Sequence, residues 1–535
     1  MVISKKGIVA TSQTLASQAG AMVLARGGSA IDAAIAANAA LTVVEPMSDG
    51  IGGDLFLIYR EAKTGKLYGL NASGPAPAGL SIEYLKRKNY TSMPGSGIDS
   101  VSVPGCVDGW AQAHRRFGKL PWAEILQPAI HYAEHGFPLT EIIQDHWRGS
   151  VGKLSVDDYS RKTFLREGRA PEVGEIVRNA DLAKALRTLA TVGPRAFYEG
   201  AIAKAIVATS RREGGVIEPG DLANFRSEWV EPISTTYRGW KVYELPPNSQ
   251  GMAALEMLNI MERFDLHHLN ALGPEAFHYK MEAQKLAYMD LQRFLADPRE
   301  SKIPLSGLIS KAYAAERAKL ISPGKALCEA PPGNPALAGS GDTVYLAAID
   351  SEGNIASLIQ SVYLSFGSGV AVEGYGFHLH NRAALFVMDP SHPNALKPGK
   401  RPFHTIIPGY MEKDGMHIGF GIMGGLNQAQ AHAQFVSYIA DHGMNIQAAL
   451  EAPRFSKQNF GGCDTKVEGR LSDEVLTLLR NRGHSIDVLA PFSGYMGGGQ
   501  VVMLDAKNKV HYAASDPRKD GAAVPEPESW WSKKQ

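Results

Sequence analysis

The sequence changes character at Thr343, and this change limits the possible folds more than any other feature. Residues 322–342 read SPGKALCEAPPGNPALAGSGD, a Pro- and Gly-rich loop with few residues for a core. Immediately after it, TVYLAAID and NIASLIQSVYL flank the turn residues SEG and predict a β-hairpin. Helical patterns dominate before the loop, and strand patterns follow it in blocks. This arrangement favours an α+β layered sandwich over a doubly wound parallel sheet.

The N-terminal region contains a clear helical pattern. SQTLASQAGAMVLARGGSAIDAAIAANAALTVVEP has apolar residues at helical spacing and predicts two packed helices separated by Gly27 and Gly28. Ser29 is a candidate N-cap for the second helix, and Pro46 would end it. The high alanine content allows such helices to approach closely or to be buried.

Length and composition exclude several classes of protein. A chain of 535 residues exceeds one ordinary compact core, so we expect two or more domains or one large intertwined unit. A net charge of +1 predicts neither a nucleic acid nor a membrane surface as a partner. No apolar run is long enough for a signal peptide or a membrane helix. We therefore expect a cytoplasmic protein.

Cysteines and histidines give no pattern of a metal site. Cys106, Cys328 and Cys463 lie far apart and in no metal-binding spacing, and we expect them to be reduced. HLH places His378 and His380 on one strand face, but no third ligand follows at a suggestive spacing, so we expect no metal. DGIGGD and GGGQ match no phosphate-binding fingerprint and are interpreted as glycine turns.

The turn of the hairpin fixes which residues face each other. A turn centred on Glu352 places Thr343 opposite Ser361 on the same face of the sheet. Two such hydroxyls are common as a structural cross-strand pair. They also suit an N-terminal nucleophile: if the Asp342–Thr343 bond is cut, the freed α-amine, with a pKa of about 8, can act as the base for the Thr343 hydroxyl. Both interpretations are open at this point.

In the second interpretation, the Thr343 hydroxyl makes the cut itself by attacking the carbonyl of Asp342, and Ser361 orients it. The same nucleophile needs hydrogen-bond donors for the oxyanion that forms. Gly424 and Gly425, at a strand end just before a helix, offer backbone N–H groups that a substrate can approach closely. An ordinary tight turn is the alternative for this glycine pair.

Together, these segments resemble the γ-glutamyltransferase family of N-terminal nucleophile (Ntn) hydrolases. ASQAGAMVLARGGSAIDAAIAANAALTVVEPMSDGIGGDLFLIY is similar to the family's N-terminal signature. DTVYLAAIDSEGNIASLIQSVYLSFGSGVAVEGYGFHLHN is similar to its nucleophile block, and KRPFHTIIP, GIMGG and YAASDPR follow in family order. The resemblance therefore covers nearly the whole chain.

The resemblance implies a four-layer αββα sandwich that is made from one precursor. The precursor would cut itself into a large subunit, residues 1–342, and a small subunit, residues 343–535, which stay together and could pair as a dimer of these heterodimers. No cofactor is implied. Carried over to this sequence, the family's site residues are the nucleophile Thr343, the supporting Ser361, and the oxyanion-hole glycines Gly424 and Gly425.

The sequence departs from the family where a γ-glutamyl group would be held. Ile82 stands in place of the arginine that binds the α-carboxylate, and Leu385 in place of the aspartate that binds the α-amine. His404 and Thr405 replace a Ser-Ser pair, and segment 387–400 is shorter than the usual lid. An aliphatic residue cannot satisfy a buried charged group. Glutathione is therefore not the substrate we expect.

Other polar residues suggest a different substrate. Arg382 stands where the family has a pocket glutamine and could bind an acid group through two hydrogen bonds, with a structural role as the alternative. Tyr363, which replaces an asparagine, and His404 and Thr405 could add polar contacts. A small acid amide suits such a pocket. This version of the motifs resembles the branch that includes glutathione-hydrolase-like proteins and oxamate amidohydrolase.

We therefore predict an autoprocessing amidohydrolase with Thr343 as the nucleophile and a small amide as the substrate. Within the enzymes, the alternatives are oxamate amidohydrolase specifically and a true γ-glutamyltransferase or glutathione hydrolase. From a different class, the alternative is a catalytically silent paralogue that acts as a binding protein.

Overall fold

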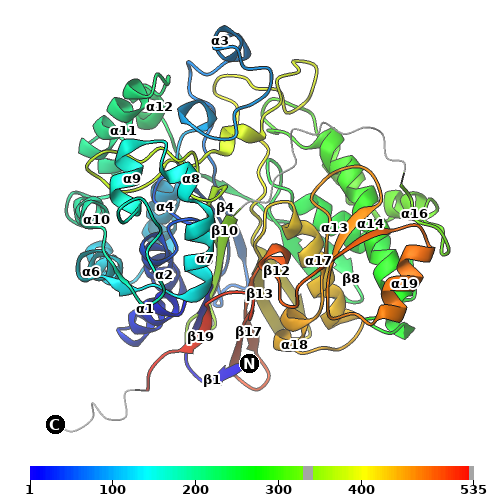
Figure 1. The fold of residues 1–535 in the computed structure, drawn as a ribbon. Helices are drawn as coiled ribbons and strands as arrows, with labels where there is room; N and C mark the ends of the chain where they lie inside the picture. The colour runs from blue at the N-terminus through cyan, green and yellow to red at the C-terminus, as the bar shows by residue number, and fades with distance from the viewer. Residues whose placement is uncertain (329–341, 529–535) are drawn as a thin grey trace.

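The computed structural model describes residues 1–328 and 342–528, and it contains two seven-stranded antiparallel sheets stacked face to face between two layers of helices (Figure 1). This is the four-layer αββα sandwich that the resemblance implied. The first sheet consists, in order, of β1 (Val2–Ser4), β18 (Val510–Ser515), β17 (Gly499–Asp505), β13 (Met416–Ile422), β12 (Gly409–Lys413), β9 (Trp240–Glu244) and β8 (Ile233–Tyr237). The second consists of β19 (Ala522–Pro525), β2 (Ile8–Thr11), β10 (Asp342–Ile349), β11 (Ile355–Tyr363), β3 (Asp54–Arg60), β4 (Leu67–Ala72) and β7 (Glu228–Val230).

Each sheet is covered on its outer face by one helical layer (Figure 1). The layer on the second sheet is built mainly from α1 (Thr14–Ala25), α2 (Ala30–Val44), α4 (Cys106–Phe117), α6 (Gln127–His135), α10 (Ala180–Val192) and α11 (Ala201–Arg212). The layer on the first sheet is built mainly from α13 (Gly251–Met261), α14 (Pro274–Phe294), α16 (Lys311–Ala318), α17 (Asn427–Ala440), α18 (Ile446–Glu451) and α19 (Asp473–Asn481).

The predicted pair of N-terminal helices is confirmed. Gly27, at φ +88°, lies in the turn between α1 and α2, a backbone conformation that glycine adopts without steric cost. The Ser29 side chain accepts a hydrogen bond from the backbone N–H of Asp32, whose carboxylate binds the Ser29 N–H in return. Every residue of α2 is buried, which explains why this helix is rich in alanine.

Strand β10 is buried on both faces, and its alternating side chains serve two different cores. Val344 and Leu346 pack into the core beneath the helices, whereas Tyr345 and Ala347 pack between the two sheets. The core between the sheets also contains Val502 of β17, which belongs to the first sheet. Side chains in the central strands are therefore fixed by packing from both sides.

The predicted hairpin register is confirmed along most of its length. Val344 pairs with Gln360 and Ile349 with Ile355, as a turn centred on Glu352 requires. At the start of β10, however, the register shifts, and Asp342 pairs with Tyr363. The prediction that Thr343 lies opposite Ser361 is thus wrong in detail, because the ladder is irregular there and Thr343 of β10 faces two residues of β11, Ser361 and Val362. Bulges re-aim side chains and are common beside functional sites.

The chain does not divide into separate domains at Thr343. Strand β10 lies between β2 and β11, and β11 in turn pairs with β3, so segments from both sides of Thr343 alternate in one sheet. The other sheet also joins β9 to β12. These shared sheets fit the expectation of one large intertwined unit.

The cysteines differ from the expectation that all are reduced. Cys328 and Cys463 form a disulfide across 135 residues of sequence, whereas Cys106 is free and buried. The two cysteines are far apart in the sequence, but the fold brings them next to each other. Over residues 1–328 and 342–528, no helix combines the length and the apolar character that crossing a membrane requires.

Candidate active site

Thr343 and Ser361 lie together at the end of the central hairpin. The Thr343 hydroxyl donates a hydrogen bond to Ser361 Oγ over 3.1 Å, and the backbone N–H of Tyr363 donates to the same oxygen over 2.8 Å. Both hydroxyl residues are buried. The structure therefore brings the two hydroxyls into contact across the irregular pairing, and the role of Ser361 in orienting Thr343 stays a prediction.

Asp54 lies beside this pair and was not among the predicted site residues. It begins β3 and pairs directly with Ser361 on β11. Its Oδ2 lies 2.8 Å from His404 Nε2 and 3.5 Å from His380 Nδ1. The only sequence signal was its position at the end of DGIGGD, immediately before the apolar strand DLFLIYR. That segment was interpreted only as a glycine turn.

Burial shifts the protonation of these groups strongly. It raises the pKa of Asp54 to about 7, even though the Arg382 charge acts in the opposite direction. Burial and the Arg382 charge together hold the pKa of His404 well below its usual range and lower that of His380 to about 3. At neutral pH both imidazoles are therefore neutral, and Asp54 carries only part of a negative charge.

Arg382 provides the positive charge of the site and is fully buried. Its Nη1 donates to Thr405 Oγ1 over 2.8 Å, and the guanidinium lies 4.6 Å from the centre of the Tyr363 ring. Its Nε is 3.7 Å from Asp54 Oδ2, beyond hydrogen-bond distance. Among the described residues, neither Nε nor Nη2 has a hydrogen-bond partner. Although burial lowers the pKa of Arg382 to about 10, it remains charged at neutral pH.

Tyr363, whose ring lies against Arg382, has an unusual backbone conformation. Its φ is +78°, in the left-handed region that an aromatic residue adopts only with strain of about 1–3 kcal/mol. The residue ends β11, pairs with Asp342 and places its ring against Arg382. The four polar residues predicted to bind substrate, Tyr363, Arg382, His404 and Thr405, are thus brought together by the fold.

Gly424 and Gly425 form the connection between β13 and α17, with φ of +128° and +62°. Gln250 links this turn to the polar cluster, because its Nε2 donates to the carbonyl oxygens of both Gly425 and Thr405. Gly424 also lines a cavity of about 520 Å³ together with His146. The assignment of Gly424 and Gly425 as donors to the oxyanion remains a prediction.

Ile82 and Leu385, which stand where the family binds the α-carboxylate and the α-amine of a glutamyl group, have apolar surroundings in the structure. Ile82 begins the short helix α3 (Ile82–Arg87) and packs with Ala383 and Phe386 in a small apolar cluster. Leu385 is buried at the end of η5 (Arg382–Leu385). No charged group of a substrate gains a partner from either side chain.

The two histidines of HLH do not share a site. His378 Nε2 lies 2.7 Å from Ser160 Oγ, whereas His380 Nε2 lies 2.9 Å from the carbonyl oxygen of Ser102 and its Nδ1 faces Asp54. Each ring is therefore fixed by different neighbours.

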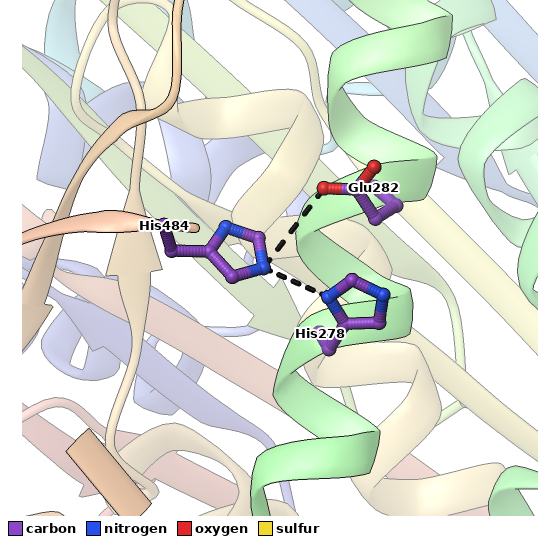
Figure 2. Close-up of side chains that lie close together, drawn as sticks. All are labelled: His278, Glu282 and His484. Carbon is purple, nitrogen blue, oxygen red and sulfur yellow. Dashed lines mark hydrogen bonds and ion pairs between the residues drawn. The ribbon is translucent and has the colours of Figure 1, made fainter. Parts of the chain in front are cut away.

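A separate cluster within the described ranges, His278, Glu282 and His484, has a composition that could hold a metal ion (Figure 2). His278 Nδ1 lies 2.8 Å from His484 Nε2, which implies a direct hydrogen bond. The Glu282 carboxylate already accepts bonds from the Lys285 ammonium group and the Leu327 N–H. A metal ion in this cluster would have to compete with the Lys285 ammonium group for the Glu282 carboxylate, so we do not assign a metal site here.

Comparisons with known proteins identify the family of the chain. The sequence profile of γ-glutamyltranspeptidase matches residues 16–526. The chain belongs to this family. It is 37% identical to the glutathione hydrolase-like YwrD proenzyme of Bacillus subtilis (strain 168), over 98% of this chain and 99% of that protein. It is 33% identical to the oxamate amidohydrolase proenzyme of Klebsiella pneumoniae, with the same coverage.

The same family includes a solved structure with a very similar fold. The crystal structure of cephalosporin acylase from Bacillus halodurans has a TM-score of 0.92 and 43% identity, and the match covers 98% of this chain and 97% of that chain. These relatives are hydrolases and acylases, and two of the three are named as proenzymes. The chain is therefore an enzyme of the Ntn hydrolase type that acts on C–N bonds by acyl transfer and is processed from one precursor into subunits.

The raised pKa of Asp54 predicts a specific pH dependence of stability. The unfolded chain releases this proton near pH 4, but the folded chain keeps it until about pH 7. The wild type should therefore lose stability between these values relative to Asp54→Asn, by about 4 kcal/mol in total, with no further change at higher pH.

Urea unfolding of both proteins from pH 4 to pH 8 measures this difference. Asp414→Asn, at an exposed turn, is the matched control and should run parallel to the wild type. Parallel curves for Asp54→Asn and the wild type would show that Asp54 titrates normally in the folded protein.

Proposed function

We propose that the chain cuts itself between Asp342 and Thr343, and that Thr343 then hydrolyses a small amide that carries an acid group. The observation that carries the proposal is the fully buried Arg382, whose Nε and Nη2 have no hydrogen-bond partner among the described residues, in a cluster that reaches the Thr343–Ser361 pair through Asp54.

The cutting step uses the Thr343 hydroxyl as the nucleophile. Its oxygen attacks the carbonyl carbon of Asp342, the C–N bond of that peptide breaks, and the nitrogen takes a proton to become the α-amine of Thr343. Water then hydrolyses the resulting ester and releases the Asp342 carboxylate and the Thr343 hydroxyl. Two observations support this step. The β-ladder is irregular between Asp342 and Val344, so the peptide bond to be cut lies outside the regular pairing. The hydrogen bond to Ser361 gives the Thr343 hydroxyl a defined direction.

Turnover of a substrate repeats the same chemistry on another amide. The freed α-amine of Thr343 accepts the proton of its own hydroxyl as the oxygen attacks the amide carbon. The proton passes to the departing amine, and water hydrolyses the acyl-enzyme ester. Backbone N–H groups at Gly424 and Gly425 are the proposed donors to the oxyanion of each tetrahedral intermediate.

The buried charge of Arg382 and the apolar residues at the glutamyl-binding positions favour a small acid amide as the substrate. An acid group can accept hydrogen bonds from Nε and Nη2 of Arg382 and would also compensate a buried charge that Asp54 balances only in part. Ile82 and Leu385 offer no partner for the α-carboxylate and α-amine of a glutamyl group. Oxamate, which has one carboxylate beside one amide, is the simplest compound of this class.

The Thr343→Ala variant should remain an intact chain of 535 residues and hydrolyse no amide, because one hydroxyl serves both steps. Thr343→Ser, which keeps a hydroxyl, is the matched control and should still be cut. A reducing denaturing gel and an assay of ammonia release measure the two effects. Normal cutting of Thr343→Ala would remove Thr343 from the mechanism.

The Arg382→Gln variant should lower kcat/KM for oxamate about 10- to 100-fold, because a hydrogen bond to a charged group contributes about 1.5–3 kcal/mol. The uncharged diamide oxamide should change much less, since it has no acid group for the guanidinium to bind. Arg263→Gln, at an exposed arginine, is the control variant. Equal losses on both compounds would mean that Arg382 only supports the fold.

A further inference from the structure

We propose that the Cys328–Cys463 disulfide joins the two chains of the mature enzyme covalently. The inference rests on the proposed cut between Asp342 and Thr343. Cys328 precedes that bond and Cys463 follows it, so the disulfide spans the cut and would become a link between the large and the small subunit. The reduced state expected from sequence would instead leave two chains that only packing holds together.

The segment that leads to Cys328 is held by residues from both proposed subunits. The backbone N–H of Ala326 donates to the carbonyl oxygen of Arg482 over 2.7 Å. Next to it, Leu327 N–H donates to Glu282 on α14 over 2.9 Å. Cys328 itself lies within 3.7 Å of the carbonyl oxygen of Gly483. One backbone hydrogen bond, from Ala326 to Arg482, therefore ties this segment to the small subunit, and the Leu327 bond to Glu282 anchors it within the large subunit.

The cluster of His278, Glu282 and His484 in Figure 2 also lies at the interface between the proposed subunits. His278 and Glu282 come from α14, before the cut, whereas His484 follows α19, after it. Burial lowers the pKa of both histidines, so the contact of His278 with His484 joins two neutral rings. His278 Nε2 also lies 2.8 Å from the carbonyl oxygen of Ser322, which places the cluster beside the segment that ends at Cys328.

The surroundings of the sulfurs favour formation of the bond. The Lys285 ammonium group lies 3.7 Å from Cys463 Sγ, and a nearby cation favours the thiolate, the form that attacks a disulfide. Cys328 is exposed and Cys463 is half-buried, so an external reagent can reach them. In the reaction, the two thiols give two protons and two electrons to an external disulfide, which leaves as two thiols.

The link would change how the cut enzyme responds to dilution. Two chains joined by packing alone unfold with a midpoint that depends on protein concentration. A disulfide makes refolding a reaction within one molecule, so the midpoint no longer depends on concentration. Reduction of Cys328–Cys463 would restore the dependence.

Denaturing gels of enzyme treated with N-ethylmaleimide, run with and without dithiothreitol, test the inference. The wild type should give one band without reductant and two bands with it. Cys463→Ser and Cys328→Ser should each give two bands in both lanes, and their urea midpoints should fall on 100-fold dilution. Cys106→Ser, which removes the free buried cysteine, is the matched control and should behave as the wild type.

Two bands from the wild type without reductant would overturn the inference and leave the proposed cut intact. One band even after reduction would overturn the proposed cut and, with it, the link between two chains. Peptide mapping of the Thr343→Ala precursor separates the two failures, because the linked pair of peptides containing Cys328 and Cys463 should appear there without any cut.

Discussion

The Asp54 carboxylate has no exposed surface, and groups from three distant parts of the chain surround it. His404 contacts it directly, Arg382 and His380 lie within 4 Å, and Ser361 pairs with it along the sheet. A buried carboxylate is costly unless such partners are present. These contacts hold His404 and Arg382 beside the strand position of Ser361, which accepts the hydrogen bond of the Thr343 hydroxyl.

The balance of charge around Asp54 is the basis for proposing an acid substrate. Both imidazoles are neutral, because burial and Arg382 oppose their protonation. Arg382 keeps its charge, and Asp54 neutralises it only in part near neutral pH. The residual positive charge lies in a place without access to bulk water, where electrostatic interactions are stronger than in water.

Local sequence patterns were sufficient to predict part of this structure. The turn residues after TVYLAAID gave the register of β10 and β11, and the capping residue Ser29 gave the start of α2. The bulge at Thr343 could not be predicted, because it depends on the pairing of Asp342 with Tyr363 at the open end of the hairpin. The family resemblance, rather than periodicity, predicted the αββα layers.

Contacts between distant segments were the main features missed. Asp54 looked like the end of a glycine turn, and its role appears only when β3 pairs with β11. Likewise, 135 residues separate Cys328 from Cys463, and no local pattern relates them. By contrast, Arg382, His404 and Thr405 were selected because they replace family residues, and the fold places them in one cluster.

The identity of the new amino terminus tests the central proposal most directly. Mass spectrometry of the mature enzyme after reduction should find a fragment that begins at Thr343 and a second that ends at Asp342. An intact chain, or a fragment that begins at any other residue, would contradict Thr343 as the self-generated N-terminal nucleophile.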